Sequence, residues 1–248
     1  MQFVKMEGLG NDFVVFEGPL GLTARQVIEL CDRRRGVGAD GVLVVTALGD
    51  GVRMEYWNAD GTPAEMCGNG LRCVARRAVD LGMVSDREFV VATPVGPRRV
   101  MVGEEDVTVD VGPSRVGDPV TVDGVTYHRA DVGNPHVVTL VDDPSRVAVG
   151  EVGPRVERRF PGGVNVEFVA VQAPAALTVR VWERGVGETQ ACGTGAVASV
   201  AVGRHLGVTG SDVEVGLPGG VARVRLEAEH SWLTGPAVTV FEGDWPRF

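Results

Sequence analysis

The sequence contains a single lysine, Lys5, so nearly all of its basic charge is arginine. Pyridoxal-phosphate enzymes hold their cofactor on a lysine as a Schiff base, and that chemistry is excluded unless Lys5 serves. A Walker A phosphate loop needs a Gly-Lys-Ser/Thr step, which is also absent. The net charge of −9 disfavours nucleic acid or an acidic membrane surface as a partner.

The sequence also lacks an apolar run near the roughly 18–20 residues that a membrane helix needs. Its first residues do not join a basic segment to an apolar one, so we predict no signal peptide and a cytoplasmic protein. Hydrophobic residues make up 44% and charged residues 23% of the 248 positions. This composition is enough for one large or two small globular domains.

No Cys-x-x-Cys motif occurs among the four cysteines, and the four histidines are scattered. A metal site is therefore not predicted. Cys31 and Cys73 lie inside helical patterns, which is typical of small buried hydrophobic side chains. Cys67 and Cys192 differ, because each precedes a Gly-x-Gly unit where a helix begins.

The chain reads as one pattern written twice. Segment 56–70 aligns with 181–195 without a gap, and Cys67 meets Cys192 at an offset of 125 positions. The Gly-Asn pairs at 10–11 and 133–134, and the turns at 38–41 and 162–165, match in the same order. Chance likeness between glycine-rich turns would explain one match, whereas the collinear set favours two copies of one domain with a boundary near 112–117.

Short apolar runs bounded by Gly, Asp and Asn predict many strands and few helices. The predicted strands cover 2–5, 14–16, 42–45, 52–57, 107–111, 120–122, 137–141, 164–171, 177–181, 221–226 and 238–241. The predicted helices cover 23–35, 71–81 and 194–206. This pattern favours an α+β fold of two similar domains over a doubly wound sheet. The Gly-x-Gly-x-x-Gly run at 36–41 follows a helix and precedes a strand, the reverse of a dinucleotide site, so that reading is rejected.

A thiol at a helix N-terminus has a specific chemistry. The helix dipole there lowers the pKa of the thiol, and the exposed N–H groups bind carboxylates. One such cysteine is explained by a tight turn, but two at equivalent positions favour function. Two thiols on opposite sides of one molecule would remove a proton from one face of a carbon and return one to the other, inverting its configuration. The N–H groups would stabilise the enolate-like charge without a cofactor.

Other polar residues fit as a pocket lining. Four asparagines, Asn11, Asn58, Asn134 and Asn165, lie in glycine-flanked turns near predicted strand ends. Taken singly, each is explained by the tolerance of asparagine for turns. The adjacent Glu183 and Arg184 would bind an ammonium and a carboxylate respectively, although such a pair is also common on exposed surfaces.

At these motifs the sequence resembles the diaminopimelate epimerase family. The matching segments are KMEGLGNDFV (5–14), GVGADGV (36–42), WNADG (57–61), MCGNGLRCVAR (66–76), GNPHVV (133–138), FPGGVNVEFV (160–169), ERGVGETQACGTGA (183–196) and LPGG (217–220). The resemblance implies an isomerase that interconverts LL- and meso-2,6-diaminoheptanedioate without a cofactor, on the route to lysine and peptidoglycan precursors. It also implies a homodimer.

The implied fold is two pseudo-symmetric α+β domains, each a curved, mostly antiparallel sheet around a central helix. The domains would be 1–112 with 237–248, and 113–236, because the last strand returns to the first domain. Cys67 and Cys192 would be the two bases. Backbone amides would hold the carboxylate at the reacting carbon, from Gly68, Asn69, Gly193 and Thr194. The amino groups and the distal carboxylate would be read by Asn11, Asn58, Asn134, Asn165, Glu183 and Arg184.

His136 and Glu183 would set the protonation states of the thiols. The chain departs from the family pattern at Glu7, where some members have His, and at Gly41, where some have Gln. Both positions are therefore left out of the predicted site.

Three other functions stay open from the sequence. The first is a racemase of another amino acid, of the proline or histidine type, on the same scaffold. Such a substrate has no second carboxylate and would leave Arg184 unpaired in the pocket. The second is a thiol–disulfide redox protein using Cys67 and Cys192, and the third is an amino-acid-binding protein without catalysis.

Overall fold

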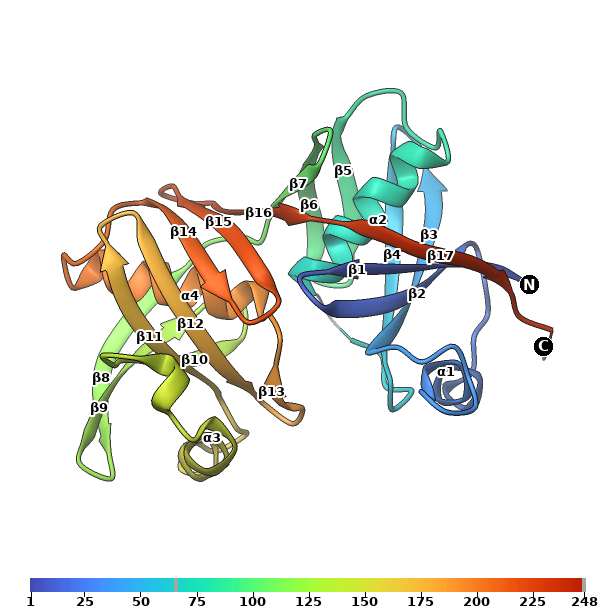
Figure 1. Cartoon of the computed structure of the whole chain (residues 1–248). Helices are drawn as coiled ribbons and strands as arrows, with labels where there is room; N and C mark the ends of the chain where they lie inside the picture. Colours follow the sequence, from blue (N-terminus) through green and yellow to red (C-terminus); the bar gives the residue numbers. More distant parts are fainter. Residues whose placement is uncertain (65–66, 247–248) are drawn as a thin grey trace. The chain divides into compact units, whose positions relative to one another are not determined.

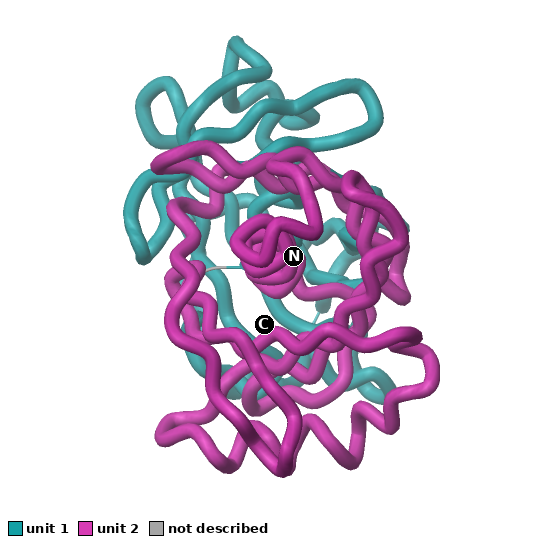
Figure 2. Tube along the Cα trace, turned by 90° about the vertical axis from the view of Figure 1, so that its left-hand side faces the viewer, with its two compact units in different colours: residues 1–109, 235–248 teal, residues 110–234 magenta. Residues whose placement is uncertain are grey.

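The computed structural model describes residues 1–64 and 67–246, which form two compact units. Unit 1 comprises Met1–Val109 and Gly235–Phe248, and unit 2 comprises Asp110–Thr234 (Figure 2). Met66 of the quoted segment 66–76, and positions 247–248 of the predicted first domain, lie outside the described residues.

The described residues of unit 1 form an eight-stranded mixed sheet. Its strands are β1 (Gln2–Gly8), β2 (Asn11–Glu17), β3 (Gly41–Leu48), β4 (Gly51–Asn58), β5 (Glu88–Thr93), β6 (Gly96–Val102), β7 (Asp106–Asp110) and β17 (Val238–Asp244). Their order in space is β17-β1-β2-β3-β4-β5-β6-β7. The pairs β2–β3 and β4–β5 are parallel, and the other pairs are antiparallel.

Unit 2 repeats this arrangement. Its strands are β8 (Arg115–Val122), β9 (Val125–Asp131), β10 (Pro135–Leu140), β11 (Asn165–Ala173), β12 (Ala176–Glu183), β13 (Gly187–Thr189), β14 (Asp212–Leu217), β15 (Gly220–Leu226) and β16 (Ser231–Pro236). Strands β8-β9-β10-β11-β12-β14-β15 follow one another in space, with β16 after β15. The parallel pairs are β10–β11 and β12–β14, at the same two places as in unit 1.

Strand register shows which residues of the two units are equivalent. Phe13 lies opposite Gly41 in the parallel pair β2–β3, and His136 lies opposite Asn165 in β10–β11. The same register makes Leu43 of β3 the equivalent of Glu167 of β11. The predicted duplication and the α+β fold of two pseudo-symmetric domains are thereby confirmed.

A central helix packs on one face of each sheet (Figure 1). These helices are α2 (Gly68–Asp80) in unit 1 and α4 (Gly193–His205) in unit 2. Almost every residue of α4 is buried, which explains its composition of Gly, Ala and Val. Figure 2 shows this helix surrounded by the strands of its own unit.

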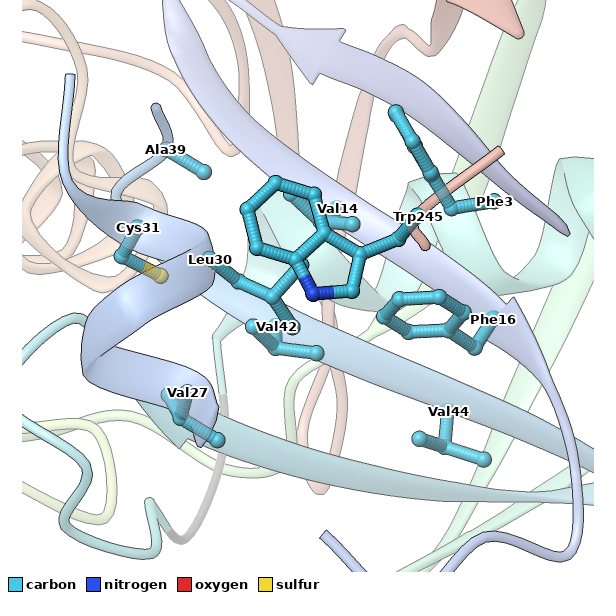
Figure 3. Packing of buried hydrophobic residues seen from close by; sticks show 10 residues of the cluster. All are labelled: Phe3, Val14, Phe16, Val27, Leu30, Cys31, Ala39, Val42, Val44 and Trp245. Atoms are coloured by element: carbon cyan, nitrogen blue, oxygen red, sulfur yellow. The ribbon is translucent and has the colours of Figure 1, made fainter. Parts of the chain in front are cut away.

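A second helix covers the opposite face of each sheet, α1 (Ala24–Cys31) in unit 1 and α3 (Val149–Glu157) in unit 2. Side chains alternate along a strand, so Val14 and Phe16 of β2 face α1 while Phe13 and Val15 face the other way. Trp245, beyond β17, packs into the same cluster as Leu30 of α1 (Figure 3). Its backbone N–H donates to the carbonyl of Met1 at 2.8 Å, so β17 is an integral strand of unit 1.

Helix ends differ from the predicted ranges for local reasons. The predicted helix 23–35 has its N-cap at Thr23, with a capping box to Gln26, but it ends at Cys31. Asp32 stops it, because Oδ1 accepts the backbone N–H groups of Arg34 and Arg35 in a turn. The predicted helices 71–81 and 194–206 begin earlier, at Gly68 and Gly193.

The limits of the units also differ slightly from the predicted 1–112 with 237–248, and 113–236. Val111 donates to Ser231 at 2.9 Å and Ser231 to Gly112 at 2.8 Å, which ties these residues to unit 2. Pro236 belongs to unit 1, where its carbonyl accepts from Arg72 Nε at 3.1 Å.

The described helices are all too short or too polar to cross a membrane. Over the same described residues, no group of three or more His, Cys, Asp and Glu side chains is arranged to hold a metal ion. All four cysteines are free thiols.

Candidate functional site

Each central helix begins with a cysteine that caps it. Cys67 precedes α2 in an extended conformation, and its Sγ accepts the N–H of Gly70 at 3.4 Å. Cys192 precedes α4 in the same conformation, and its Sγ accepts from Gly195 at 3.3 Å. Each sulfur therefore lies at the positive end of a helix, beside first-turn N–H groups that suit an anion.

The second glycine of each Cys-Gly-x-Gly unit is needed for packing inside the protein. A Cβ on Gly195 would lie 2.7 Å from Glu167 Oε1 and 3.2 Å from Cys192 Sγ. A Cβ on Gly70 would lie 3.2 Å from the side chain of Leu43. The first turn of α2 therefore packs on Leu43, and the first turn of α4 packs on Glu167, the equivalent residue of the second sheet.

Buried acids surround Cys192, which is only 5% exposed. Burial raises the pKa of Cys192 well above its ordinary value, and the charges of Glu183 and Glu167 raise it further. Thr194 and the N–H of Gly195 oppose this rise. Burial also raises the pKa of Glu183, against hydrogen bonds from Thr189 and Cys192.

A chain of side chains connects the inner sheet to the start of α4. His136 Nδ1 lies 2.7 Å from Glu167 Oε1, and its Nε2 lies 2.9 Å from Asn134 Oδ1. Asn134 Nδ2 donates to Thr194 Oγ1 at 3.3 Å, and that hydroxyl lies 3.6 Å from Cys192 Sγ.

Both ring nitrogens of His136 therefore face acceptor oxygens. A hydrogen bond between His136 and Glu167 therefore needs a proton between Nδ1 and Oε1. Burial raises the pKa of Glu167, while His136 opposes that rise.

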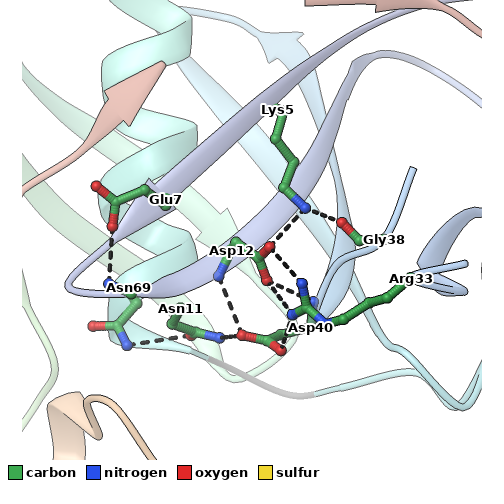
Figure 4. Close-up of polar contacts among 9 residues, drawn as sticks. Lys5, Glu7, Asn11, Asp12, Arg33, Gly38, Asp40 and Asn69 are labelled. Atoms are coloured by element: carbon green, nitrogen blue, oxygen red, sulfur yellow. Dashed lines mark hydrogen bonds and ion pairs between the residues drawn. The ribbon is translucent and has the colours of Figure 1, made fainter. Parts of the chain in front are cut away.

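Cys67, in contrast, is half-buried among amides. Its Sγ lies 3.5 Å from Asn11 Oδ1, which also accepts from Asn69 Nδ2 at 3.2 Å. Figure 4 shows Asn11 between Asn69 and Asp40, whose Oδ2 accepts from Asn11 Nδ2 at 2.7 Å. Glu7, one of the two family departures, points toward the same helix turn in Figure 4.

Arg72 lies on α2 behind Cys67 and is fully buried. Its Nε donates to Pro236 at 3.1 Å and its Nη1 to the carbonyl of Gly68 at 3.4 Å. Among the residues that the structure describes, Nη2 has no hydrogen-bond partner and no carboxylate pairs with the guanidinium. Burial lowers the pKa of Arg72, which the nearby Cys73 and Cys67 counter, and an arginine in a protein keeps its charge.

The remaining predicted residues lie at the ends of β4, β11 and β12. Asn58 donates to Thr62 Oγ1 at 3.1 Å. Asn165 donates to the carbonyl of Pro135 at 3.0 Å and accepts from the backbone of Arg184 at 2.9 Å. The guanidinium of Arg184 is exposed, and Nη1 makes one long bond of 3.4 Å to Gly162.

With this geometry described, comparison with known proteins is informative. Residues 3–117 and 129–240 match the family model for diaminopimelate epimerase. Diaminopimelate epimerase of Alkalilimnicola ehrlichii is 43% identical over 273 residues, covering 98% of each chain. The enzyme of Moorella thermoacetica is 40% identical over 280 residues, covering 99% of each. The chain belongs to the diaminopimelate epimerase family.

Solved structures of more distant proteins share the fold. A probable proline racemase of Agrobacterium radiobacter has a TM-score of 0.77 and 17% identity, covering 100% of this chain and 93% of the other. A PhzF-family phenazine biosynthesis protein of Enterococcus faecalis has a TM-score of 0.77 and 13% identity, covering 98% and 97%. The predicted family, the fold class and an isomerase of the amino-acid epimerase type are therefore confirmed.

Within this family member, the structure gathers the predicted residues into two clusters. In unit 1, Asn11 and Asn69 contact each other, and Asn11 lies beside Cys67. The cluster of unit 2 comprises Cys192, Thr194, Asn134, His136 and Glu183, with Asn165 and Arg184 joined to each other.

Sequence reasoning missed Glu167, Arg72 and Asp40. Glu167 interrupts the apolar run VNVEFV, and a charge inside a buried strand is a detectable signal. Arg72 likewise interrupts the apolar, buried stretch 71–75 of α2. Asp40 gives no such signal, because acidic residues are common in glycine-rich turns.

Proposed function

We propose that this chain interconverts LL- and meso-2,6-diaminoheptanedioate without a cofactor, using Cys67 and Cys192 as acid and base on opposite faces of one carbon. The observation that supports this most directly is that, in a member of this family, both thiols cap equivalent helices. The proposed mechanism requires both sulfurs to reach the same substrate carbon.

In the proposed step, one thiolate takes the proton from Cα, and the bonding pair moves into the adjacent carboxylate as an enediolate. First-turn amides of α2 and α4, at Gly68, Asn69, Gly193 and Thr194, would hold this charge. The second thiol then gives its proton to the opposite face of Cα, and the configuration inverts. The sulfurs have exchanged protonation states, so the same pair catalyses the reverse direction.

Cys192 is the proposed acid in the resting enzyme. Burial and the charges of Glu183 and Glu167 raise its pKa, so this sulfur keeps its proton at neutral pH. The positive charge of the fully buried Arg72 lies behind Cys67 and favours its thiolate. Cys67 is therefore the proposed base that begins the reaction, and His136 with Glu183 governs the proton on Cys192.

The distal end of the substrate is assigned to polar residues at the strand ends. Arg184, exposed and without an ion pair among the described residues, would bind the distal carboxylate in a fork. Asn165 would position Arg184, since it accepts the backbone N–H of that residue. Asn58, Asn134, Asn11 and Glu183 would bind the amino groups and the remaining carboxylate oxygen.

Turnover of purified protein in D₂O tests substrate and mechanism together. We expect one solvent deuteron at Cα of each epimerised molecule, with no added metal, pyridoxal phosphate or nucleotide. Failure to interconvert the two isomers, combined with racemisation of proline or another monocarboxylate, would contradict the proposal. Activity that appears only on cycling between reduced and oxidised protein would favour a redox function instead.

We also propose that the chain is a homodimer of the cytoplasm, acting on the route to lysine and peptidoglycan precursors. Strand β17 pairs with β1 and carries exposed Val238, Val240 and Phe241, and an exposed apolar strand is a common association surface. Sedimentation of the wild type against Val240→Lys tests this, since a dimer that uses β17 should dissociate and a monomer should not change.

A further inference from the structure

The side-chain amide of Asn11 is held in one of its two possible orientations. Its Oδ1 faces Cys67 Sγ at 3.5 Å and Asn69 Nδ2 at 3.2 Å, whereas its Nδ2 donates to Asp40 Oδ2 at 2.7 Å. The two ends of an amide have the same shape but opposite hydrogen-bonding character. The group that accepts from Nδ2 therefore decides which end faces the sulfur.

Asp40 is that group, and it cannot change role. Its Oδ1 accepts from Arg33 Nη2 at 2.8 Å, while its Oδ2 accepts from Asn11 and from the backbone of Asp12 at 3.2 Å. The same Arg33 grips Asp12 with two bonds of 3.0 and 2.7 Å, and Lys5 lies 2.7 Å from Asp12 (Figure 4). Asp40 is thus fixed as an acceptor on both oxygens.

Unit 2 has no such arrangement. The positions equivalent to Asp12 and Asp40 are Pro135 and Val164, neither of which has a polar side chain. Asn134, the equivalent of Asn11, is turned the other way, with its Oδ1 toward His136 and its Nδ2 toward Thr194. The orientation imposed by Asp40 is therefore specific to the half-site of Cys67.

We propose that Asp40 is a positioning residue, which fixes the carbonyl of Asn11 toward Cys67 and so stabilises the protonated form of that sulfur. This inference rests on the proposed function, in which Cys67 accepts the proton of a weakly acidic Cα–H. A partner that stabilises the thiol makes the thiolate a stronger base. The charged groups described around this half-site are Arg72 on α2, Glu7 on β1 and, beside Asp40, Asp12 with Lys5 and Arg33.

The substitution Asp40→Asn tests this directly. An asparagine has one acceptor atom, and the permanent charge of Arg33 will keep that oxygen. The new NH₂ group then faces Asn11 Nδ2, so Asn11 must rotate and present an N–H group to Cys67. We expect alkylation of Cys67 by iodoacetamide at pH 7 to become roughly fivefold to tenfold faster, while kcat falls by a similar factor.

Three measurements separate orientation from simpler effects. Peptide mass spectrometry reports Cys31 and Cys73 in the same sample, and these buried thiols, whose pKa values burial raises to about 12, label only if the fold opens. Asp50→Asn, an exposed carboxylate in the β3–β4 turn, is the matched control and should leave Cys67 unchanged. The third is Asp40→Asn combined with Asn11→Ala, in which the effect on Cys67 should largely vanish.

An equal acceleration in the Asn11→Ala background would show that the lost charge of Asp40 acts directly, and would overturn the inference. So would an unchanged Cys67 rate. If Asp40→Asn exposes Cys31 and Cys73, the single variant Asn11→Ala serves instead. It removes the carbonyl that faces Cys67, so alkylation of Cys67 should again become faster, and an unchanged rate would overturn the inference. Alkylation needs no substrate, so a failed epimerase assay would leave these outcomes readable.

Discussion

The two half-sites share one geometry and differ in the charges behind it. Cys67 and Cys192 cap equivalent helices with nearly equal sulfur–amide distances of 3.4 and 3.3 Å. Behind Cys192 lie the buried pair His136 and Glu167, whereas the equivalent positions in unit 1 are the apolar Phe13 and Leu43. The two units therefore share the backbone arrangement that places each sulfur at the start of a helix.

One turn into the central helices, it is unit 1 that has a buried charged residue and unit 2 that has an apolar one. Unit 1 has the buried Arg72, and the position 125 residues later in α4 is Val197. Acids therefore surround one thiol and a guanidinium lies behind the other. Burial and the neighbouring acids raise the pKa of Cys192, whereas a positive charge behind Cys67 favours its thiolate.

The largest expected effect tests whether both half-sites are needed. Cys67→Ser and Cys192→Ser should each lower kcat by about 10²–10⁴-fold, because a serine hydroxyl is too weak an acid and base for either proton transfer. Measurement is by interconversion of the two diaminoheptanedioate isomers, with circular dichroism as a control for folding. Near-normal turnover in either variant would mean that one thiol is sufficient.

The next effect distinguishes the two sulfurs in unmodified protein. Because burial and neighbouring acids raise the pKa of Cys192, iodoacetamide at pH 7 should label Cys67 about a hundredfold faster. Rates come from peptide mass spectrometry over time. Equal labelling rates would show that the different charges near the two helices do not change the reactivity of the thiols.

Asp12 tests the stability of unit 1. Burial alone would raise its pKa, but hydrogen bonds from Arg33 and Lys5 lower it from 3.8 to about 2. Such a carboxylate stabilises the fold above its ordinary pKa, and that contribution is lost as the pH falls toward 2. Asp12→Asn should lower the free energy of unfolding by about 2 kcal/mol at pH 7. It should also weaken the loss of stability that the wild type shows as the pH falls toward 2.

Hydrogen exchange resolved by peptide measures that cost in each unit separately. Unit 2 has Pro135 at the equivalent position, so its protection should change less than that of unit 1. An equal loss of protection in both units would contradict a local role for this ion pair.

The smallest effect concerns Arg72. Arg72→Met keeps the apolar length of the side chain and removes its charge, so alkylation of Cys67 at pH 7 should slow about tenfold while Cys192 is unchanged. Val74→Ala, buried on the same helix, is the control and should lower stability without altering either rate. A similar slowing in the control would assign the effect to packing.

The sequence was most informative where chemistry and local structure coincide. The repeat, the helices that begin after Cys67 and Cys192, and the family all follow from short motifs with fixed spacing. The sequence did not predict helix α3, because Gly150, Gly153 and Pro154 all have low helix propensity. The helix is stabilised instead by packing in the hydrophobic core of its own unit.

The missing parts of the candidate site depend on distant contacts. Glu167 meets His136 across a parallel strand pair, and Asp40 meets Asn11 across 29 positions of chain. Pairing between such segments is decided by the register of the sheet, which local patterns do not specify. The roles assigned to the site residues remain predictions for the experiments above.

The position of strand β17 at the end of the chain affects how the protein folds during its synthesis. Unit 1 needs residues 235–246 to complete its sheet and to place Trp245 in its core, yet these are synthesised after the whole of unit 2. During translation, the first half of the chain must therefore wait on the ribosome while the second half can already fold. Nascent unit 1 has an open edge beside β1 throughout that interval, and this is when we expect the protein to depend most on chaperones.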